Sequence, residues 1–315
     1  MGIDIISWEY RTWLGITAKL PLPIGASLSA LRGAINAASD RDWRSLSLGQ
    51  PYVRERTALA LKELEGIRTL QEGHHRSGNL SARSIKQRTR ERFIYSAYEE
   101  WQAALIQKNR AEQLSFEGEA QHQKLPSQII VATMHVDSPM LGLVQLGRWG
   151  RPLCALSSDI VEDPRVHPAI QWFFKEKYRA MATHWQGGRC MHKEREMSLF
   201  IKAAKHGRSL AIFCDSPGKL GHSKGYLTPF LGANRLMAPV LHRVAHLVQL
   251  PVVAMLCRRI STTRYRIEFS HLCHPTKADD WLVPIYQFWT EKILENPSAW
   301  WACDLLDSMV IKQPH

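Results

Sequence analysis

From residue 126 onward, short apolar runs alternate with segments whose apolar residues recur at helical spacing. The runs typical of strands are QIIVATM, PLCALSS, SLAIFCD, PVVAMLCR and YRIEFSHL, separated by segments such as AIQWFFKEKYRAM and SLFIKAAKHG. Strands and helices that alternate in this way build a mostly parallel sheet covered by helices on its faces. Residues 126–315 are therefore predicted to form an α/β domain, with the last two runs paired near one edge of its central sheet.

The preceding part, residues 1–125, has a different pattern and is predicted to be a helical N-terminal region. Pro51–Leu70 begins with proline and carries apolar residues at helical spacing, and Ser81–Gln113 predicts a second long helix. Gly73–Asn79 is a polar break between them. Residues 112–128 are polar and are predicted to be a linker between the two regions.

The charge of the chain limits its partners. With 41 Lys and Arg residues against 29 Asp and Glu residues, the formal net charge is +12. Such a surplus favours nucleic acid, anionic lipid headgroups or an acidic carrier protein. Nucleic acid is the least favoured of the three, because the sequence contains no helix-turn-helix, RNA-recognition or zinc-finger pattern. The six cysteines are dispersed without a CxxC pair, and no histidine spacing suggests a metal site.

Two of the expected strands end on a polar side chain that can do chemistry. His135 follows the run IIVATM, and Asp215 ends the run SLAIFCD. Ligands of open α/β sheets lie beyond the carboxyl ends of the strands, where a neutral histidine can act as a base. Asp137 is the nearest carboxylate in the sequence and could orient the ring of His135. Alternatively, Asp137 only caps the helix that the following Ser-Pro predicts, and His135 is a loop histidine.

Three segments, taken in order, resemble the lipid A late acyltransferases of Gram-negative bacteria. This family is also called the lauroyl/myristoyl acyltransferases and belongs to the lysophospholipid acyltransferase superfamily. The segments are ATMHVDSPMLG, the long stretch from SLFIKAAKHG through YLTPFLG to PVVAML, and ENPSAWWACDL. The resemblance extends from about Pro126 to Ala302 and implies the fold already predicted.

The resemblance implies an enzyme that moves a fatty acyl group from a thioester to a hydroxyl. The donor would be acyl carrier protein or CoA, the acceptor a lipid A-like or other amphiphilic molecule, and no cofactor would be needed beyond the thioester co-substrate. His135 matches the family's base. The family usually places an acidic residue five positions after the histidine, where this chain has Met140, and Asp137 is predicted to take over that role. The alternative is a catalytically degenerate fold that binds acyl chains or the carrier protein without turnover.

The family also implies a place in the cell, the cytoplasmic face of the bacterial inner membrane. No stretch of the sequence reaches the ~18 uninterrupted apolar residues of a membrane-spanning helix, so peripheral attachment to an anionic surface is expected. The aromatic residues Trp8, Tyr10 and Trp13 could form an interfacial face or pack in the core.

Further residues are predicted to bind substrate. Lys219 and Lys224 lie among glycines, which let backbone amides approach an anion, and Asp215 could orient a substrate. Alternatively, Asp215 caps a turn and the lysines are simply solvated. By resemblance, YLTPFLG with Phe230 and Gly232 walls the acyl site, and a basic residue near GGRCMHKERE contacts negative groups of the substrate. The predicted set is Arg189, Arg195, Asp215, Lys219, Lys224, Phe230 and Gly232.

Overall fold

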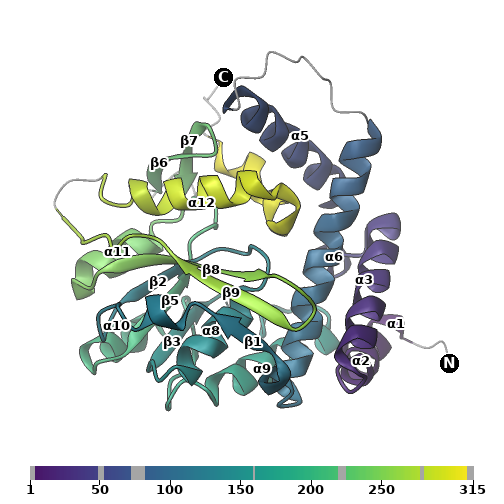
Figure 1. The fold of residues 1–315 in the computed structure, drawn as a ribbon, viewed down its shortest axis with the longest axis horizontal. Helices are drawn as coiled ribbons and strands as arrows, with labels where there is room; N and C mark the ends of the chain where they lie inside the picture. Colours follow the sequence, from purple (N-terminus) through teal and green to yellow (C-terminus); the bar gives the residue numbers. More distant parts are fainter. Residues whose placement is uncertain are drawn as a thin grey trace.

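A seven-stranded sheet forms the centre of the computed structural model, which describes residues 4–48, 53–71, 82–158, 160–218, 225–276 and 280–310 (Figure 1). In order across the sheet, the strands are β1 (Ser115–Glu117), β9 (Arg264–Phe269), β8 (Val252–Arg259), β2 (Ile130–Thr133), β5 (Ser209–Phe213), β3 (Leu153–Ser157) and β4 (Cys190–His192). The strands from β8 to β4 are parallel, whereas β9 is antiparallel to β8. The predicted mostly parallel sheet and the strand pair near one edge are confirmed.

Helices cover both faces of the sheet. One face packs against α6 (Ala82–Gln107), α8 (Pro139–Arg148) and α9 (Pro168–Ala182). The other packs against α10 (Met197–Lys205), α11 (Val240–Val248) and α12 (Val283–Glu295). Strand β2 lies between two apolar cores and is buried along its whole length, as expected for a central parallel strand. A small hairpin of β6 (Tyr226–Phe230) and β7 (Ala233–Met237) lies outside the main sheet.

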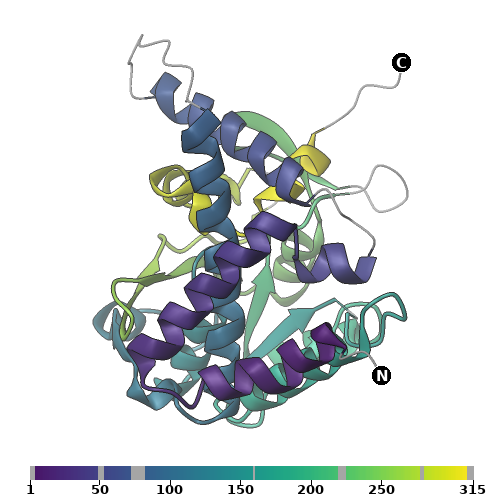
Figure 2. The same cartoon turned by 90° about the vertical axis from the view of Figure 1, so that its right-hand side faces the viewer.

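The N-terminal part is helical, as predicted. It contains α1 (Ile5–Trp8), the π-helical turn η1 (Glu9–Trp13), α2 (Leu14–Thr17), α3 (Leu22–Ser39), α4 (Trp43–Leu48) and α5 (Val53–Gln71). Helices α5 and α6 correspond to the two long helices expected from the sequence, and the polar break between them lies outside the described residues. Helix α3 packs along α6 and is outermost on that side of the molecule (Figures 1 and 2). None of the helices in the described ranges is both long and apolar enough to cross a bilayer.

The predicted linker at residues 112–128 is wrong, because this stretch is part of the fold. It holds the 3₁₀ turn η2 (Ala111–Gln113), strand β1 and the short helix α7 (Glu119–His122). Strand β1 pairs with β9 in register, with Phe116 opposite Tyr265. Its polar composition suits an edge strand whose Glu117 pairs with two arginines of β9. Residues on both sides of position 126 thus contribute to one sheet.

Candidate active site

The pairing of β2 with β5 brings together two residues that are far apart in the sequence. Thr133 lies opposite Phe213 at the carboxyl ends of these neighbouring parallel strands. His135 and Asp215 each follow two residues later, so they reach the same height beyond the sheet. This edge is where open α/β sheets bind their ligands.

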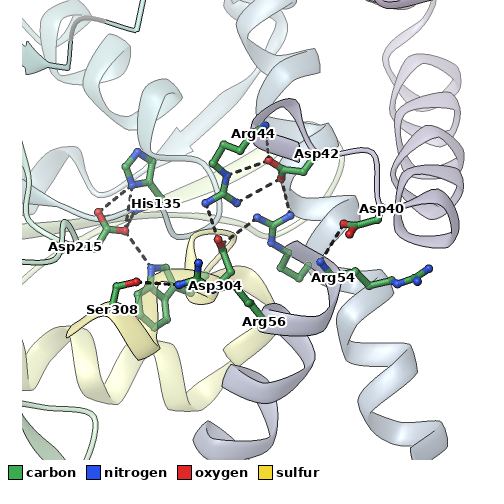
Figure 3. Close-up of polar contacts among 11 residues, drawn as sticks. Asp40, Asp42, Arg44, Arg54, Arg56, His135, Asp215, Asp304 and Ser308 are labelled. Carbon is green, nitrogen blue, oxygen red and sulfur yellow. Dashed lines mark hydrogen bonds and ion pairs between the residues drawn. The ribbon is translucent and has the colours of Figure 1, made fainter. Parts of the chain in front are cut away.

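His135 and Asp215 form a hydrogen-bonded pair in which Asp215 is buried and His135 is partly exposed (Figure 3). The ring Nδ1 of His135 lies 2.9 Å from Oδ1 of Asp215, and the backbone N–H of His135 donates to Oδ2 over 2.8 Å. The ring stacks on Phe213, with centroids 4.4 Å apart, and meets the edge of Trp301 at 4.6 Å. These contacts hold the imidazole in a single orientation, with 27% of its side chain still exposed.

The electrostatics of the pair determine which ring nitrogen can accept a proton. Burial alone would raise the pKa of Asp215, but attraction to His135 and hydrogen bonds from His135 and Trp300 outweigh it and lower the pKa. The side chain is therefore a carboxylate, which only accepts hydrogen bonds, so Nδ1 of His135 must carry its hydrogen. Nε2 has the free lone pair and makes no hydrogen bond to the described part of the chain. This is the tautomer that a histidine base requires.

The structure corrects the predicted partner of His135. Asp137 does not contact the ring; its Oδ1 accepts from the Ser138 hydroxyl at 2.7 Å, and its Oδ2 accepts from the backbone N–H of Arg259 at 3.0 Å. Its left-handed backbone (φ 55°) turns the carboxylate toward the end of β8. Burial raises the pKa of Asp137. This residue fastens the loop before α8, while Asp215 supplies the carboxylate beside His135.

A cavity of about 770 Å³ opens beside His135. Its walls are mostly apolar and come from helices on both faces of the sheet, including Leu143 of α8, Met181 of α9 and Val244 of α11. Met140, at the position where the resemblance led us to expect an acid, is part of this wall. The volume lies in the range of sites that enclose whole small-molecule ligands, and the lining suits a hydrocarbon chain.

The cavity also contains a few charged groups. Lys177 is almost fully buried and pairs with Glu99, its Nζ 3.3 Å from Oε1 and 4.3 Å from the centre of the Phe174 ring. Lys193 and Arg243 line the same cavity. Within the described ranges, no three His, Cys, Asp or Glu side chains lie close enough together to hold a metal ion.

Four other residues predicted to bind substrate are not among the described residues that line this cavity: Arg189, Arg195, Phe230 and Gly232. Arg189 pairs with Glu196 and Arg195 pairs with Glu162, both at half-exposed positions. Phe230 is buried behind the site, its ring packed edge-on against Trp300 with centroids 5.9 Å apart. Gly232 takes a positive φ of 73° in the turn between β6 and β7. Lys219 and Lys224 are outside the described residues. A substrate role for the seven residues of the predicted set, Asp215 included, stays a prediction.

Sequence reasoning missed the two tryptophans that complete the site. Trp300 donates from Nε1 to Oδ2 of Asp215 over 3.0 Å, and the backbone N–H of Trp301 donates to the carbonyl of His135 at 3.0 Å. Both belong to ENPSAWWACDL, which carried part of the family resemblance. The adjacent tryptophans were the available signal, because a buried indole N–H needs an acceptor.

Replacing Trp300 with phenylalanine should remove one of the N–H donors to Oδ2 of Asp215 while keeping an aromatic ring. We expect kcat to fall about tenfold, which corresponds to ~1.4 kcal/mol in the transition state. Trp289→Phe is the matched control, because Trp289 is equally buried and its Nε1 has no hydrogen-bond partner among the residues that the structure describes. Steady-state kinetics and thermal melts of both variants test this. An equal loss of kcat in the two would mean that packing, and not the hydrogen bond, is responsible.

A buried ion-pair network anchors the segment that carries these tryptophans (Figure 3). Asp304 of η4 (Cys303–Met309) accepts from Arg44 at 2.9 Å, and Arg44 also binds Asp42. Arg92 of α6 lies between Asp42 at 2.9 Å and Asp304 at 3.5 Å and is completely buried. The network joins the N-terminal helices to the C-terminal segment.

Replacing Arg92 with methionine should leave Asp42 and Asp304 as buried carboxylates short of one cation. Removing one partner of a buried ion pair costs about 3–5 kcal/mol in the free energy of unfolding. Arg90→Ala on the exposed side of the same helix should change it by less than about 0.5 kcal/mol. Urea denaturation measures both values. A loss for Arg92→Met as small as that of the control would refute an anchoring role.

A histidine paired with a carboxylate beside a mostly apolar cavity, at the carboxyl edge of an α/β sheet, suits an enzyme that acts on hydrophobic substrates. In agreement, the sequence model of the family described as bacterial lipid A biosynthesis acyltransferase matches residues 105–301, more than half of the chain. The chain belongs to this family and is an acyltransferase of lipid A biosynthesis, with an acyl donor and a lipid acceptor. The predicted resemblance is confirmed. A search of curated proteins found no match to this chain.

Proposed function

We propose that this enzyme transfers a fatty acyl group from a thioester of acyl carrier protein or CoA to a hydroxyl of a lipid A-like acceptor. His135 acts as the general base, and Asp215 supports it. The observation that carries the proposal is the hydrogen bond between Nδ1 of His135 and ionised Asp215, which leaves Nε2 free beside an apolar cavity. The thioester is the co-substrate.

In the proposed reaction, Nε2 of His135 removes the proton of the acceptor hydroxyl as its oxygen attacks the thioester carbonyl carbon. The resulting tetrahedral intermediate collapses, the carbon–sulfur bond breaks, and the imidazolium returns the proton to the departing thiolate. Asp215 stabilises the imidazolium in between and keeps the ring in the productive tautomer. The ester and the free thiol are the products.

The lining of the cavity supports this assignment of substrates. The apolar side chains from α8, α9 and α11 offer a surface for the acyl chain. Lys193 and Arg243 line the same cavity and provide positive charge for the developing oxyanion or for a phosphate of donor or acceptor. The net charge of +12 suits both an acidic carrier protein and an anionic bilayer. We therefore place the enzyme as a peripheral protein on the cytoplasmic face of the inner membrane.

The alternative, a degenerate fold that binds acyl chains without turnover, was suggested by Met140. The location of Asp215 weakens that alternative, because it gives His135 the carboxylate that position 140 does not provide. Catalysis is therefore the better-supported function.

The proposal is tested by incubating the purified protein with lauroyl and myristoyl thioesters of both carriers and a lipid A precursor. Mass spectrometry should find the acceptor heavier by one acyl group, and lipids from cells with and without the gene should differ in the same way. Saturable binding of acyl thioester with no product from any donor would instead establish the binding-only alternative.

A further inference from the structure

Helix α3 carries its charged residue on the inner side and apolar residues on the outer side, the opposite of an ordinary surface helix. Arg32 is the only charged residue in Leu22–Ser39. It points inward, is 7% exposed, and pairs with the buried carboxylates of Glu9 and Glu100. A helix that borders water normally places its charges outward. The one charge of α3 is instead enclosed within the protein.

The outer side of α3 carries no charge and is mostly apolar. Ile24, Leu31 and Ile35 are 51%, 56% and 56% exposed, and their spacing of seven and four residues aligns them in one stripe. A stripe of large aliphatic side chains without a charge is costly to keep in contact with water. Something other than water is therefore expected to cover it.

The short helices before α3 extend this surface. Ile5, Trp8 and Ile16 are 57%, 46% and 48% exposed. Helices α1, α2 and α3 lie on the same side of the molecule, which faces the viewer in Figure 2. We call Ile5, Trp8, Ile16, Ile24, Leu31 and Ile35 the N-terminal apolar face. Of the aromatic residues considered in the sequence, Trp8 belongs to this face, whereas Tyr10 is buried in the core.

Within residues 5–39, which carry the N-terminal apolar face, the exposed charges are positive. Arg11 and Lys19 are exposed beside it, and the Arg11 guanidinium lies over the ring of Trp172 at 5.9 Å. The acidic residues of positions 4–39 are Asp4, which pairs with His167, and Glu9, which is buried against Arg32 and Arg41. Exposed aliphatic and tryptophan side chains bordered by Arg and Lys are the composition of helices that lie in the interface of an anionic bilayer.

We infer that the N-terminal apolar face lies in the headgroup region of an anionic lipid bilayer and holds the enzyme on the membrane. This inference rests on the proposed membrane association and names the surface responsible for it. Helix α4 follows α3 directly and supplies Trp43 to the lining of the catalytic cavity. Attachment through α3 therefore keeps the cavity close to the lipid phase from which an amphiphilic acceptor must enter.

The test measures co-sedimentation with vesicles of equal parts phosphatidylcholine and phosphatidylglycerol. The double variant Leu31→Glu with Ile35→Glu should bind about tenfold or more weakly than the wild type, because binding scales with the apolar area buried. Leu59→Glu on α5 is the matched control, since Leu59 is 69% exposed outside the face, and should bind like the wild type. Acyl transfer in detergent should be unchanged in both variants, which shows that they fold.

Three outcomes would overturn the inference. If the wild type does not co-sediment with these vesicles, membrane association as a whole is refuted. A wild type that binds while the double variant binds equally well refutes only the role of this face. A wild type that sediments as a dimer and becomes monomeric in the double variant, with vesicle binding retained, assigns the face to a second copy of the chain.

Discussion

The Asp215→Asn variant is expected to lose about 10²–10⁴-fold in kcat while keeping the volume of the side chain. In the wild type both carboxylate oxygens accept hydrogen bonds: Oδ1 from the His135 ring at 2.9 Å, and Oδ2 from the His135 backbone and Trp300, with the ring Nδ1 also 3.1 Å from Oδ2. An asparagine has only one oxygen, so its NH2 group must face one of these sets of donors. If the NH2 group faces the ring, Nδ1 becomes an acceptor and Nε2 carries the hydrogen, so His135 can no longer act as the base.

Single-turnover rates and the pH dependence of kcat test this expectation, and binding of the acyl thioester should be nearly unchanged. Asp137→Asn is the matched control, because Asp137 is also a buried carboxylate near the loop but does not contact the ring. If both variants are folded and Asp137→Asn loses more kcat than Asp215→Asn, then Asp137 and not Asp215 supports His135.

The His135→Ala variant is expected to show a loss of similar size, about 10²–10⁴-fold, since it removes the proposed base entirely. The residual rate should no longer depend on the state of Asp215, so the double variant with Asp215→Asn should be about as slow as His135→Ala alone. Such non-additivity is characteristic of residues that act as a unit.

The rate of acyl transfer is measured by mass spectrometry of the product, with His271→Ala as the control at an exposed histidine. His135→Ala leaves Asp215 buried with one partner fewer, which could lower the stability of the protein. Thermal melts therefore check that the variant is folded at the assay temperature. Transfer that continues at the wild-type rate in folded His135→Ala would eliminate the proposed mechanism.

Local sequence patterns were sufficient to predict most of the elements and to single out His135 as the candidate base. The apolar runs predicted the strands because central parallel strands are buried on both faces, and Ser138-Pro139 correctly marked the start of α8. His135 could be singled out because it follows a strand of this kind. The edge strand β1 was missed, since a short polar strand has no apolar pattern.

The partner of His135 could not be predicted in the same way, because it depends on the order of the strands. Asp137 is two residues from His135, yet its positive φ turns it away, whereas Asp215 is 80 positions distant and adjacent in space. Only the pairing of β2 with β5 makes them neighbours. Trp300 and Trp301 were missed for the same reason, since their partners are set by tertiary packing.

The alignment of β2 with β5 also bears on how relatives of this enzyme are recognised. In the proposed mechanism, the acid that assists the histidine comes from the adjoining strand and not from the helix that follows the histidine. Motif searches that demand a fixed interval between histidine and acid would discard this chain as inactive. If the proposed role of Asp215 is borne out, genomes screened by such a motif will undercount acyltransferases that share this arrangement.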